Sequence, residues 1–332
     1  MTQYLIPQFQ RALVEDAAGQ PVFVHDAPVP RLRPRTLLVK TTAVAINPSD
    51  YKIGANCPTP RAILGMDFVG KILQMDAEAV ELRPDLAVGD KVCGFVHGSN
   101  PADPNNGSFA EYLRAHAQLV YRVPEDMKDG AAATMGVSTA TAVLALWHAL
   151  KLPASPEAPL TPNVFAPNYV LVYGASTASG TMILQLLKLS GFTTIATCSP
   201  KNFSLVKSYG ADHVFDYADE NTSERIRQVT GKRLEYVVDC ITDKFSLACC
   251  YAAMARFGGR YVTLEMCSED MKPRRRAVKQ EFVLALDIFG ERVELNRGYE
   301  REASPDLHEF AVKWYHIIQS LIRDVLSMGF GC

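Results

Sequence analysis

Residues 169–182, YVLVYGASTASGTM, set a loop of small residues between an apolar run and a pattern of helical spacing. Gly174 and Gly180 bracket the loop, while Ser176 and Thr177 stand where a dinucleotide-binding fingerprint usually has glycine. A strand, a small-residue loop and a helix start together expose free backbone N–H groups that can bind phosphate. The loop therefore predicts a phosphate cradle, and a plain strand-to-helix turn is the alternative interpretation.

The next strand-like run, residues 193–198, is followed by Ser199, Pro200, Lys201 and Asn202, with no acidic residue. A site for NAD usually has Asp or Glu about 20 residues after the glycines, where it binds the ribose hydroxyls. Ser199 can donate to a phosphate and Lys201 supplies positive charge, which favours the 2′-phosphate of NADP over NAD. An N-capped helix with an exposed lysine explains the same residues without a ligand.

These loops need a scaffold, which the pattern of the chain after residue 167 predicts. Apolar strand-like runs alternate there with helical patterns, down to the run 260–264. Such alternation is typical of a doubly wound parallel sheet. The first 125 residues instead predict short β-strands, followed by a helical stretch over 129–150 with a break near Gly136. The predicted fold class is therefore α/β, with a β-rich domain first.

The stretch 152–167 contains five prolines, which predicts a linker or surface loop because proline fixes φ and has no N–H to donate. A domain boundary is expected there. We accordingly predict a first domain at 1–155, a nucleotide-binding domain at 156–300 and a C-terminal helical segment at 301–332.

Composition argues against several classes of protein. The 332 residues are 48% hydrophobic and 21% charged, and the formal net charge of -2 provides no field that favours nucleic acid or an anionic membrane. The least polar stretch, 131–150, is rich in Ala, Thr, Gly and Ser, which indicates a buried helix rather than a membrane span. No secretion signal begins the chain and its eight cysteines form no C-x-x-C pair. We therefore expect reduced cysteines in a cytoplasmic protein.

Four motifs, taken in order, resemble the medium-chain dehydrogenase/reductase superfamily: AVAINPSDYK (43–52), ILGMDFVG (63–70), VGDKVCGF (88–95) and GSFAEY (107–112). The resemblance implies a GroES-like β-rich domain followed by a Rossmann domain. Zinc-dependent members carry Cys in the first motif and Gly-His-Glu in the second, where this chain has Asn47 and Gly65-Met66-Asp67. A thioether cannot replace imidazole as a zinc ligand. The resemblance is therefore to the zinc-free quinone and enoyl reductases, and we assign no residue to a metal.

Further motifs narrow the resemblance: VSTA (137–140), VLVYGASTA (170–178), ATCSPKNF (196–203), VFDY (214–217), DCIT (239–242) and IFGE (288–291). Together with INPSDYK they resemble the trans-acting enoyl reductases of fungal polyketide synthases. Such proteins act as separate partners of a synthase whose own reductase domain is inactive. The resemblance implies NADPH-dependent reduction of an α,β-unsaturated polyketide thioester on an acyl carrier protein, by a monomeric enzyme. A free-standing quinone or enone oxidoreductase is the alternative enzyme.

The resemblance also implies residue roles. Lys52 would lie near cofactor and substrate, as a proton donor or a ligand of the nicotinamide ribose, and Tyr51 is a rival proton donor. Thr139 would contact substrate or nicotinamide, unless it bonds its own helix backbone. The expected cofactor-binding set is Ser49, Asp50, Tyr51, Lys52, Ser176, Thr177, Ala178, Ser179, Ser199, Pro200, Lys201, Asn202, Tyr217, Leu264 and Glu265. The expected substrate-binding set is Thr139, Ala140, Thr141, Ala142, Val143, Leu144, Ala145, Leu146, Trp147, Asp287, Ile288, Phe289, Gly290 and Glu291.

The C-terminal segment leaves another class of function open. The resemblance implies a longer C-terminal region that returns to the first domain as a helix and a strand. This chain ends in LSMGFGC, which has no strand pattern, so we expect a truncated version of that region. A missing strand would leave backbone groups unpaired. A catalytically inactive partner that keeps the fold and the nucleotide is therefore a further alternative.

Overall fold

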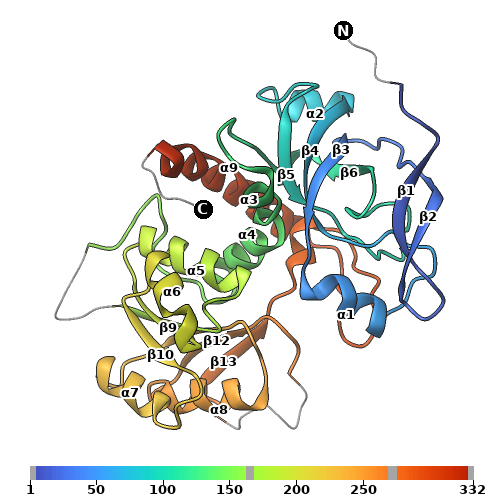
Figure 1. Ribbon diagram of the computed structural model, residues 1–332. Helices are drawn as coiled ribbons and strands as arrows, with labels where there is room; N and C mark the ends of the chain where they lie inside the picture. Colours follow the sequence, from blue (N-terminus) through green and yellow to red (C-terminus); the bar gives the residue numbers. More distant parts are fainter. Residues whose placement is uncertain (1–4, 162–167, 268–274, 328–332) are drawn as a thin grey trace. The chain divides into compact units, whose positions relative to one another are not determined.

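The structure is a computed structural model that describes residues 5–161, 168–267 and 275–327, with side chains described up to residue 322 (Figure 1). It divides into two compact units. Unit 1 comprises Met1–Val137 together with Leu286–Cys332, and unit 2 comprises Ser138–Ala285. These limits differ from the expected boundaries after residues 155 and 300. The first boundary differs because the described part of the proline-rich stretch, residues 152–161, belongs to unit 2, where the Leu160 N–H donates to the Ser190 carbonyl at 3.0 Å.

Unit 1 is built on a five-stranded antiparallel sheet with the strand order β6-β3-β4-β5-β7. Its strands are β3 (Thr36–Ala45), β4 (Asp67–Met75), β5 (Lys91–Phe95), β6 (Tyr112–His116) and β7 (Val120–Arg122). Val39, Ile72 and Val92 face one buried core, as alternation along each strand requires. A separate antiparallel pair is formed by β1 (Phe9–Glu15) and β2 (Pro21–Pro28). The β-rich first part of the chain is thereby confirmed.

The helices of unit 1 lie between and after these strands: α1 (Pro48–Asn56), α2 (Ala77–Leu82), η1 (Ala117–Leu119), α3 (Asp129–Ala133) and α9 (Pro305–Ser327). The sequence patterns did not predict α1 or α2, which are short. The expected break near Gly136 lies instead at Thr134, the C-cap of α3. Gly136 has a different role, because a Cβ there would lie 2.4 Å from the Gly94 carbonyl oxygen. No helix in the described ranges is long and apolar enough to cross a membrane.

Unit 2 contains a six-stranded parallel sheet with the order β10-β9-β8-β11-β12-β13. The strands are β8 (Tyr169–Tyr173), β9 (Thr193–Cys198), β10 (His213–Asp216), β11 (Tyr236–Asp239), β12 (Gly259–Thr263) and β13 (Val278–Phe282). The direction of winding reverses between β8 and β11, and ligands of open parallel sheets bind at the carboxyl ends of strands beside such a reversal. The predicted doubly wound sheet is thus confirmed, and β13 extends it by a strand that the sequence reading missed.

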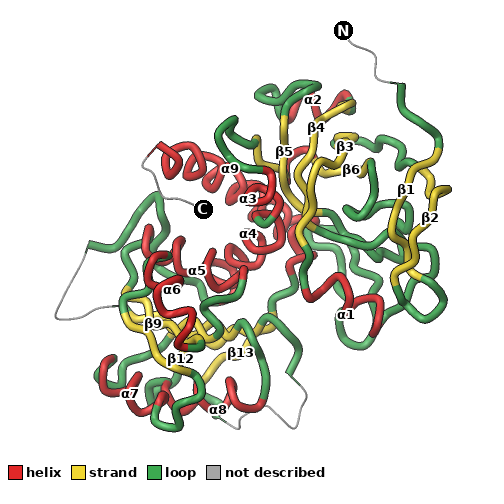
Figure 2. Tube along the Cα trace, viewed as in Figure 1, coloured by secondary structure: helices red, strands yellow, loops and turns green. Residues whose placement is uncertain are grey.

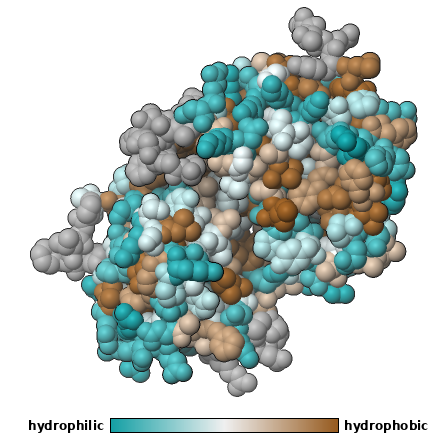
Figure 3. All heavy atoms as spheres, in the orientation of Figure 1, coloured by the Kyte–Doolittle hydropathy of each residue, from teal (hydrophilic) through white to brown (hydrophobic). Residues whose placement is uncertain are grey.

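Helices cover both faces of this sheet (Figure 2). The helices α5 (Ala178–Leu189) and α6 (Phe203–Ser208) lie on one face, and α7 (Thr222–Val229) and α8 (Lys244–Ala253) lie on the other. Leu171, Ile195 and Val237 belong to the buried core on the side of α7 and α8. The expected helix over 129–150 continues into unit 2 as α4 (Met135–Val143) and a π-helical segment, η2 (Leu144–Ala149). Figure 3 shows hydrophilic and hydrophobic residues interspersed over the drawn face. Large apolar side chains are exposed in both units, for example Phe23 at 56% and Phe245 at 68%.

Candidate active site

The loop after β8 is shaped by two glycines. Gly174 has a φ of 76°, and a Cβ there would lie 2.7 Å from Cγ1 of Ile241. A Cβ on Gly180, in the first turn of α5, would lie 2.7 Å from the Gly174 carbonyl oxygen. The absence of both Cβ atoms lets the start of α5 approach the end of β8 closely, which is what the glycines of a dinucleotide-binding turn provide. The positive end of the helix dipole then lies at the carboxyl edge of the sheet.

Thr177 is the N-cap of α5. Its Oγ1 accepts from the Gly180 N–H at 3.1 Å and donates to the Gly174 carbonyl at 2.9 Å. The hydroxyl expected to bind phosphate is therefore engaged in holding the loop. Ser176 and Ser179 are half-buried and Ala178 is exposed at the helix start. Among the expected phosphate contacts, the serine hydroxyls and the first N–H groups of α5 are thus the groups best placed to bind an anion.

A small polar cluster joins the ends of β8 and β9. Nδ2 of Asn202 donates to Oγ of Ser176 at 3.2 Å and to Oγ of Ser199 at 3.4 Å. Residues 200–202 form a short 3-10 helix, for which Ser199 is the N-cap by position but makes no side-chain capping bond. The capping interpretation of Ser199 therefore lacks its hydrogen bond. Ser176, Ser199 and Asn202 together offer hydroxyl and amide donors at one edge of the sheet.

Exposed side chains lie around this cluster. Lys201 and Pro200 are exposed, and Tyr217, the first residue after β10, is 52% exposed. Because β9 pairs in parallel with both β8 and β10, the carboxyl ends of these three strands lie side by side. No carboxylate follows β9 directly, and Asp216 ends the neighbouring strand β10.

Asp239, at the end of β11, organises the next loop, and the sequence reading did not single it out. Its Oδ1 accepts from the N–H groups of Ile241 and Thr242, both at 2.9 Å. Its Oδ2 accepts from the hydroxyls of Ser246 at 2.5 Å and Tyr261 at 2.6 Å. Burial raises the pKa of Asp239, and the four hydrogen bonds that its carboxylate accepts lower the pKa again in part. In the sequence, the signal that could have identified this residue is an aspartate at the end of an apolar strand-like run.

Leu264 and Glu265 follow β12 and are half-buried. The Leu264 N–H donates to the Asp239 carbonyl at 3.2 Å, so this turn is tied to the end of β11. Both residues thus lie at the carboxyl edge of the unit 2 sheet, where the resemblance places the nicotinamide. Oγ1 of Thr263, just before them, is buried and makes no hydrogen bond within the described residues.

Thr139 and the segment 140–147 belong to unit 2, although we expected them in the first domain. Oγ1 of Thr139 is buried and makes no hydrogen bond to any described residue, so the interpretation in which it bonds its own helix is not supported. The residues from Ala140 to Leu146 are buried in this unit. Trp147 is half-buried and its Nε1 donates to the Ala154 carbonyl at 2.8 Å. Most of the expected channel segment therefore packs as a core helix, and Oγ1 of Thr139 is a buried polar atom in it that bonds to no described residue.

In unit 1, Asn47 connects two buried carboxylates. Its backbone N–H donates to Oδ2 of Asp50 at 2.7 Å, and its Nδ2 donates to Oδ2 of Asp67 at 2.9 Å. Oδ1 of Asp67 also accepts from the Val137 N–H at 2.7 Å. Burial raises the pKa of Asp67 to about 7 and that of Asp50 to about 6, although the hydrogen bonds oppose the shift. Asp50, expected as a cofactor contact, is instead directed into this network.

The residues next to Asn47 show whether unit 1 offers the ligands of a zinc site. Oγ of Ser49 donates to Sδ of Met66 at 3.4 Å, so the thioether fills the position where a zinc-dependent relative would carry histidine. Asn47 and Met66 supply no imidazole, thiolate or carboxylate, which are the ligands that zinc prefers. In the described part of the chain, no group of three or more His, Cys, Asp or Glu could hold a metal ion.

Helix α1 presents Tyr51 and Lys52 on its outer side. Tyr51 is 63% exposed and Lys52 is also exposed. The half-buried alternative for Tyr51 is therefore wrong. Both candidate proton donors are accessible, and the Asn47 network fixes the first turn of the helix that carries them.

The segment 287–291 lies in unit 1, not in the nucleotide-binding unit as expected. Ile288 is buried, and Asp287 pairs with Arg301 at 3.5 Å. The ring of Phe289 lies 4.9 Å from that of Phe95, centre to centre. Gly290 has a φ of 67° and lies directly after the short 3-10 helix that ends at Phe289. Of the five residues, Phe289 and Glu291 line a cavity of unit 1.

Comparisons with known proteins agree with both units. Residues 33–125 match the alcohol dehydrogenase GroES-like domain, and residues 178–295 match the family described as zinc-binding dehydrogenase. Among solved structures, an alcohol dehydrogenase superfamily protein from Novosphingobium aromaticivorans has a TM-score of 0.73 at 22% identity, covering 95% of this chain and 87% of that one. The CurK enoyl reductase has a TM-score of 0.70 at 19% identity, covering 96% and 89%. These likenesses establish the fold.

The curated relatives are closer in sequence. Trans-enoyl reductase poxP of Penicillium oxalicum is 42% identical over 320 residues, which are 96% of this chain and 84% of the relative. Trans-enoyl reductase caaB of Aspergillus niger is 44% identical over 324 residues, which are 96% and 88%. Identity at this level over nearly the whole chain places both units in one family. The chain belongs to the trans-enoyl reductases, oxidoreductases of the medium-chain dehydrogenase/reductase superfamily.

Proposed function

We propose that the protein reduces the α,β-double bond of a polyketide thioester on an acyl carrier protein, with NADPH as the reductant, in the service of a separate polyketide synthase. The designation of its relatives as trans-enoyl reductases supports the reaction class. The cofactor, when bound, would supply a hydride to the β-carbon of the enoyl thioester. The protein itself must then bind the cofactor and the substrate, orient them, and protonate the reduced substrate.

The observation that supports the choice of NADPH is the polar loop that follows β9, residues 199–202, which contains no acidic residue. Asn202 holds the hydroxyls of Ser176 and Ser199 at 3.2 and 3.4 Å, with Lys201 exposed beside them. Hydroxyl, amide and ammonium donors suit a phosphate dianion, whereas a ribose diol calls for a carboxylate. A mycobacterial neighbour of the same fold was solved with NADPH, which agrees with this assignment.

The residues of helix α1 would supply the proton. Addition of hydride at the β-carbon leaves an enolate, which must accept a proton at the α-carbon. Tyr51 and Lys52 are the accessible acids on α1, and Asn47 fixes the start of that helix between two buried carboxylates. We assign protonation to one of these two residues, and the other would position the nicotinamide ribose.

The decisive experiment follows nicotinamide absorbance while the purified protein reacts with an enoyl thioester on a pantetheine arm. NADPH should be consumed at least about tenfold more efficiently than NADH, which corresponds to about 1.4 kcal/mol of preference. Tyr51→Phe and Lys52→Met should separate the two acids: the variant that lacks the proton donor loses kcat, whereas the variant that lacks a ribose ligand raises the KM for NADPH.

Three other outcomes would overturn the proposal. Failure to bind NADPH would remove the cofactor assignment. Tight binding of NADPH without turnover of any enoyl thioester would instead identify a non-catalytic partner of a synthase. Turnover of small quinones, but not of enoyl thioesters, would identify a free-standing quinone reductase.

A further inference from the structure

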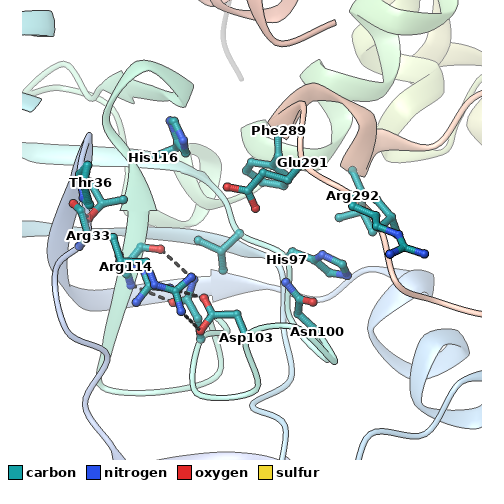
Figure 4. Close-up of a pocket in the computed structure, with 15 residues that line it drawn as sticks. Arg33, Thr36, His97, Asn100, Asp103, Arg114, His116, Phe289, Glu291 and Arg292 are labelled. Carbon is teal, nitrogen blue, oxygen red and sulfur yellow. Dashed lines mark hydrogen bonds and ion pairs between the residues drawn. The ribbon is translucent and has the colours of Figure 1, made fainter. Parts of the chain in front are cut away.

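Unit 1 contains a cavity of about 270 Å³, and Phe289 and Glu291 of the expected substrate-binding set are two of its lining residues (Figure 4). Its walls come from the loop after β5, from β6, from the start of β3 and from the residues that follow η5 (Ala285–Phe289). Ligand pockets typically measure about 300–1,000 Å³, so this cavity suits a small molecule. Its lining is rich in charged and polar side chains, whereas an acyl chain requires an apolar wall.

Three arginines line the cavity: Arg33, Arg114 and Arg292. Figure 4 shows Arg33, Arg114 and Asp103 on one side of the cavity and Arg292 on the other side. Asp103 bonds to both Arg33, at 3.2 Å, and Arg114. The only other carboxylate of the lining is Glu291, which leaves an excess of one positive charge over the walls.

Buried Arg114 is held rigidly. Only 7% of its side chain is exposed, and Nη1 donates to the Arg31 carbonyl at 2.8 Å while Nη2 donates to Asp103. Burial lowers the pKa of Arg114, although Asp103 and Glu291 oppose that shift. A guanidinium fixed in this way keeps its position when a ligand arrives, so little conformational entropy is lost on binding. Arg33 and Arg292 are exposed and can turn toward a ligand.

Two histidines contribute unused hydrogen-bonding atoms. Nε2 of His97 and Nδ1 of His116 are buried and have no hydrogen-bond partner among the described residues. Burial lowers the pKa of His97 to about 4, and burial together with His308 and Arg35 lowers that of His116 to about 4. Both imidazoles are therefore neutral at pH 7. A polar atom that is buried and unpaired is unfavourable, and a ligand that forms a hydrogen bond to it removes that cost.

We propose that this cavity is a binding site for a small anion carrying a carboxylate or phosphate group, with Arg33 and Arg292 as mobile charged ligands and Arg114 as a fixed one. Arginine recognises both groups through paired N–H donors, and His97 and His116 add neutral contacts. Glu291 opposes the binding because its charge faces the same cavity. The site lies wholly within unit 1 and does not depend on the proposed reaction.

The test is calorimetric titration of the full chain with inorganic phosphate and, separately, with succinate, at low ionic strength. We expect saturable binding of at least one anion to one site. Arg33→Gln and Arg292→Gln should each weaken it about tenfold, which is what loss of a charged hydrogen bond costs. Glu291→Gln should tighten it several-fold, because it removes a repulsive charge. A general effect of net charge would give the same opposite signs, because Arg→Gln removes a positive charge and Glu→Gln a negative one, so an arginine outside the cavity is needed as a control.

Arg61→Gln serves as the matched control. Arg61 belongs to the same unit, is exposed and pairs with Asp26, but it does not line the cavity. Its variant should bind the anion as the wild type does. Histidine side-chain NMR provides the location, because the resonances of His97 and His116 should move during the titration. The proposal is overturned if neither anion binds, if Arg61→Gln weakens binding as much as the cavity variants do, or if both histidine resonances stay fixed.

Discussion

At the scale of single side chains, exposed Lys201 is the residue that we propose to select NADPH over NADH. It follows β9, where the chain offers Ser199 and Asn202 but no acid. Lys201→Gln should raise the KM for NADPH about tenfold and change the KM for NADH little, because the lost charge faces only the extra phosphate. Steady-state kinetics with both cofactors measures this. Lys207→Gln, an exposed lysine of α6, is the control, and equal effects of both variants would contradict the assignment.

Asp67 is a second residue with a measurable signature, since burial raises its pKa from 3.8 to about 7. The folded protein therefore binds more protons than the unfolded chain between these values, so stability falls as pH rises through that window. The loss amounts to at most about 1.4 kcal/mol per pH unit for this group. Asp67→Asn should flatten this slope, leaving the smaller contribution of Asp50, whose pKa is raised to about 6.

Urea unfolding at about pH 5 and about pH 8 measures the difference in slope. The absolute stability of Asp67→Asn is not the readout, because asparagine cannot accept both hydrogen bonds that Asp67 accepts from Asn47 and Val137. Asp126→Asn, at an exposed position, should leave the slope unchanged. An Asp67→Asn protein with the wild-type slope would show that Asp67 does not titrate in this range.

Among the elements, the turn from β8 into α5 makes the sharpest demand on sequence. Gly180→Ala would normally favour a helix by up to about 1 kcal/mol. Here the new Cβ would lie 2.7 Å from the Gly174 carbonyl oxygen, and backbone cannot move aside cheaply. We expect a loss of about 1–3 kcal/mol of stability and weaker NADPH binding. Thermal unfolding and a cofactor titration measure both.

The control for that substitution is Gly130→Ala in α3. A Cβ at Gly130 would meet nothing within 4 Å, so alanine should be neutral or stabilising there. If the two variants unfold at the same temperature, close approach of helix and strand does not explain Gly180.

The elements also show how far sequence reasoning reaches. Alternation of strands and helices, with Gly174 at the end of an apolar run, was enough to predict the parallel sheet and the glycine-containing turn from β8 into α5. The pattern did not predict α1, whose buried positions are Asp50 and Gly54 rather than an apolar stripe. It also missed β13, a strand of alternating polarity at the edge of the sheet. Both are stabilised by contacts with distant residues, which local patterns do not record.

The candidate site residues likewise fall into those that the sequence could predict and those that depend on tertiary contacts. The polar edge around Ser176 and Ser199 was predicted because its function depends on residue type beside a strand end. The inward direction of Asp50 was not predicted, because it depends on a hydrogen bond from Asn47 and on burial. The resemblance to a family supplied roles, but it could not supply the packing of the segment 140–147.

At the scale of the whole molecule, unit 1 is assembled from two distant parts of the chain. Gln319 of α9 joins them, since its Oε1 accepts from the Arg122 N–H at 2.6 Å and its Nε2 donates to the Arg122 carbonyl at 3.2 Å. The side chain thus completes the edge of β7. No local sequence pattern could place the boundary of such a unit, because its contacts join residues nearly 200 positions apart.

Gln319→Ala should therefore cost about 1–3 kcal/mol, because it leaves two backbone groups of an edge strand without a partner. Gln319→Glu should recover part of this, as it keeps an acceptor for the Arg122 N–H. The temperature of thermal unfolding is the measurement. Ser320→Ala, whose hydroxyl bonds only the His316 carbonyl, should unfold close to the wild type, and a drop as large as that of Gln319→Ala would contradict the role of Gln319.

Because unit 1 is built from two separate parts of the chain, its folding cannot be completed until both parts have been synthesised. Residues 1–137 emerge first, yet β7 lacks Gln319 until the segment after residue 285 has been made. At about 5–20 residues per second, synthesis of the intervening stretch takes on the order of ten seconds. During that interval β7 is an edge strand without its partner Gln319, while the inserted nucleotide-binding unit can already fold. Nascent chains should therefore be most vulnerable to aggregation before α9 emerges.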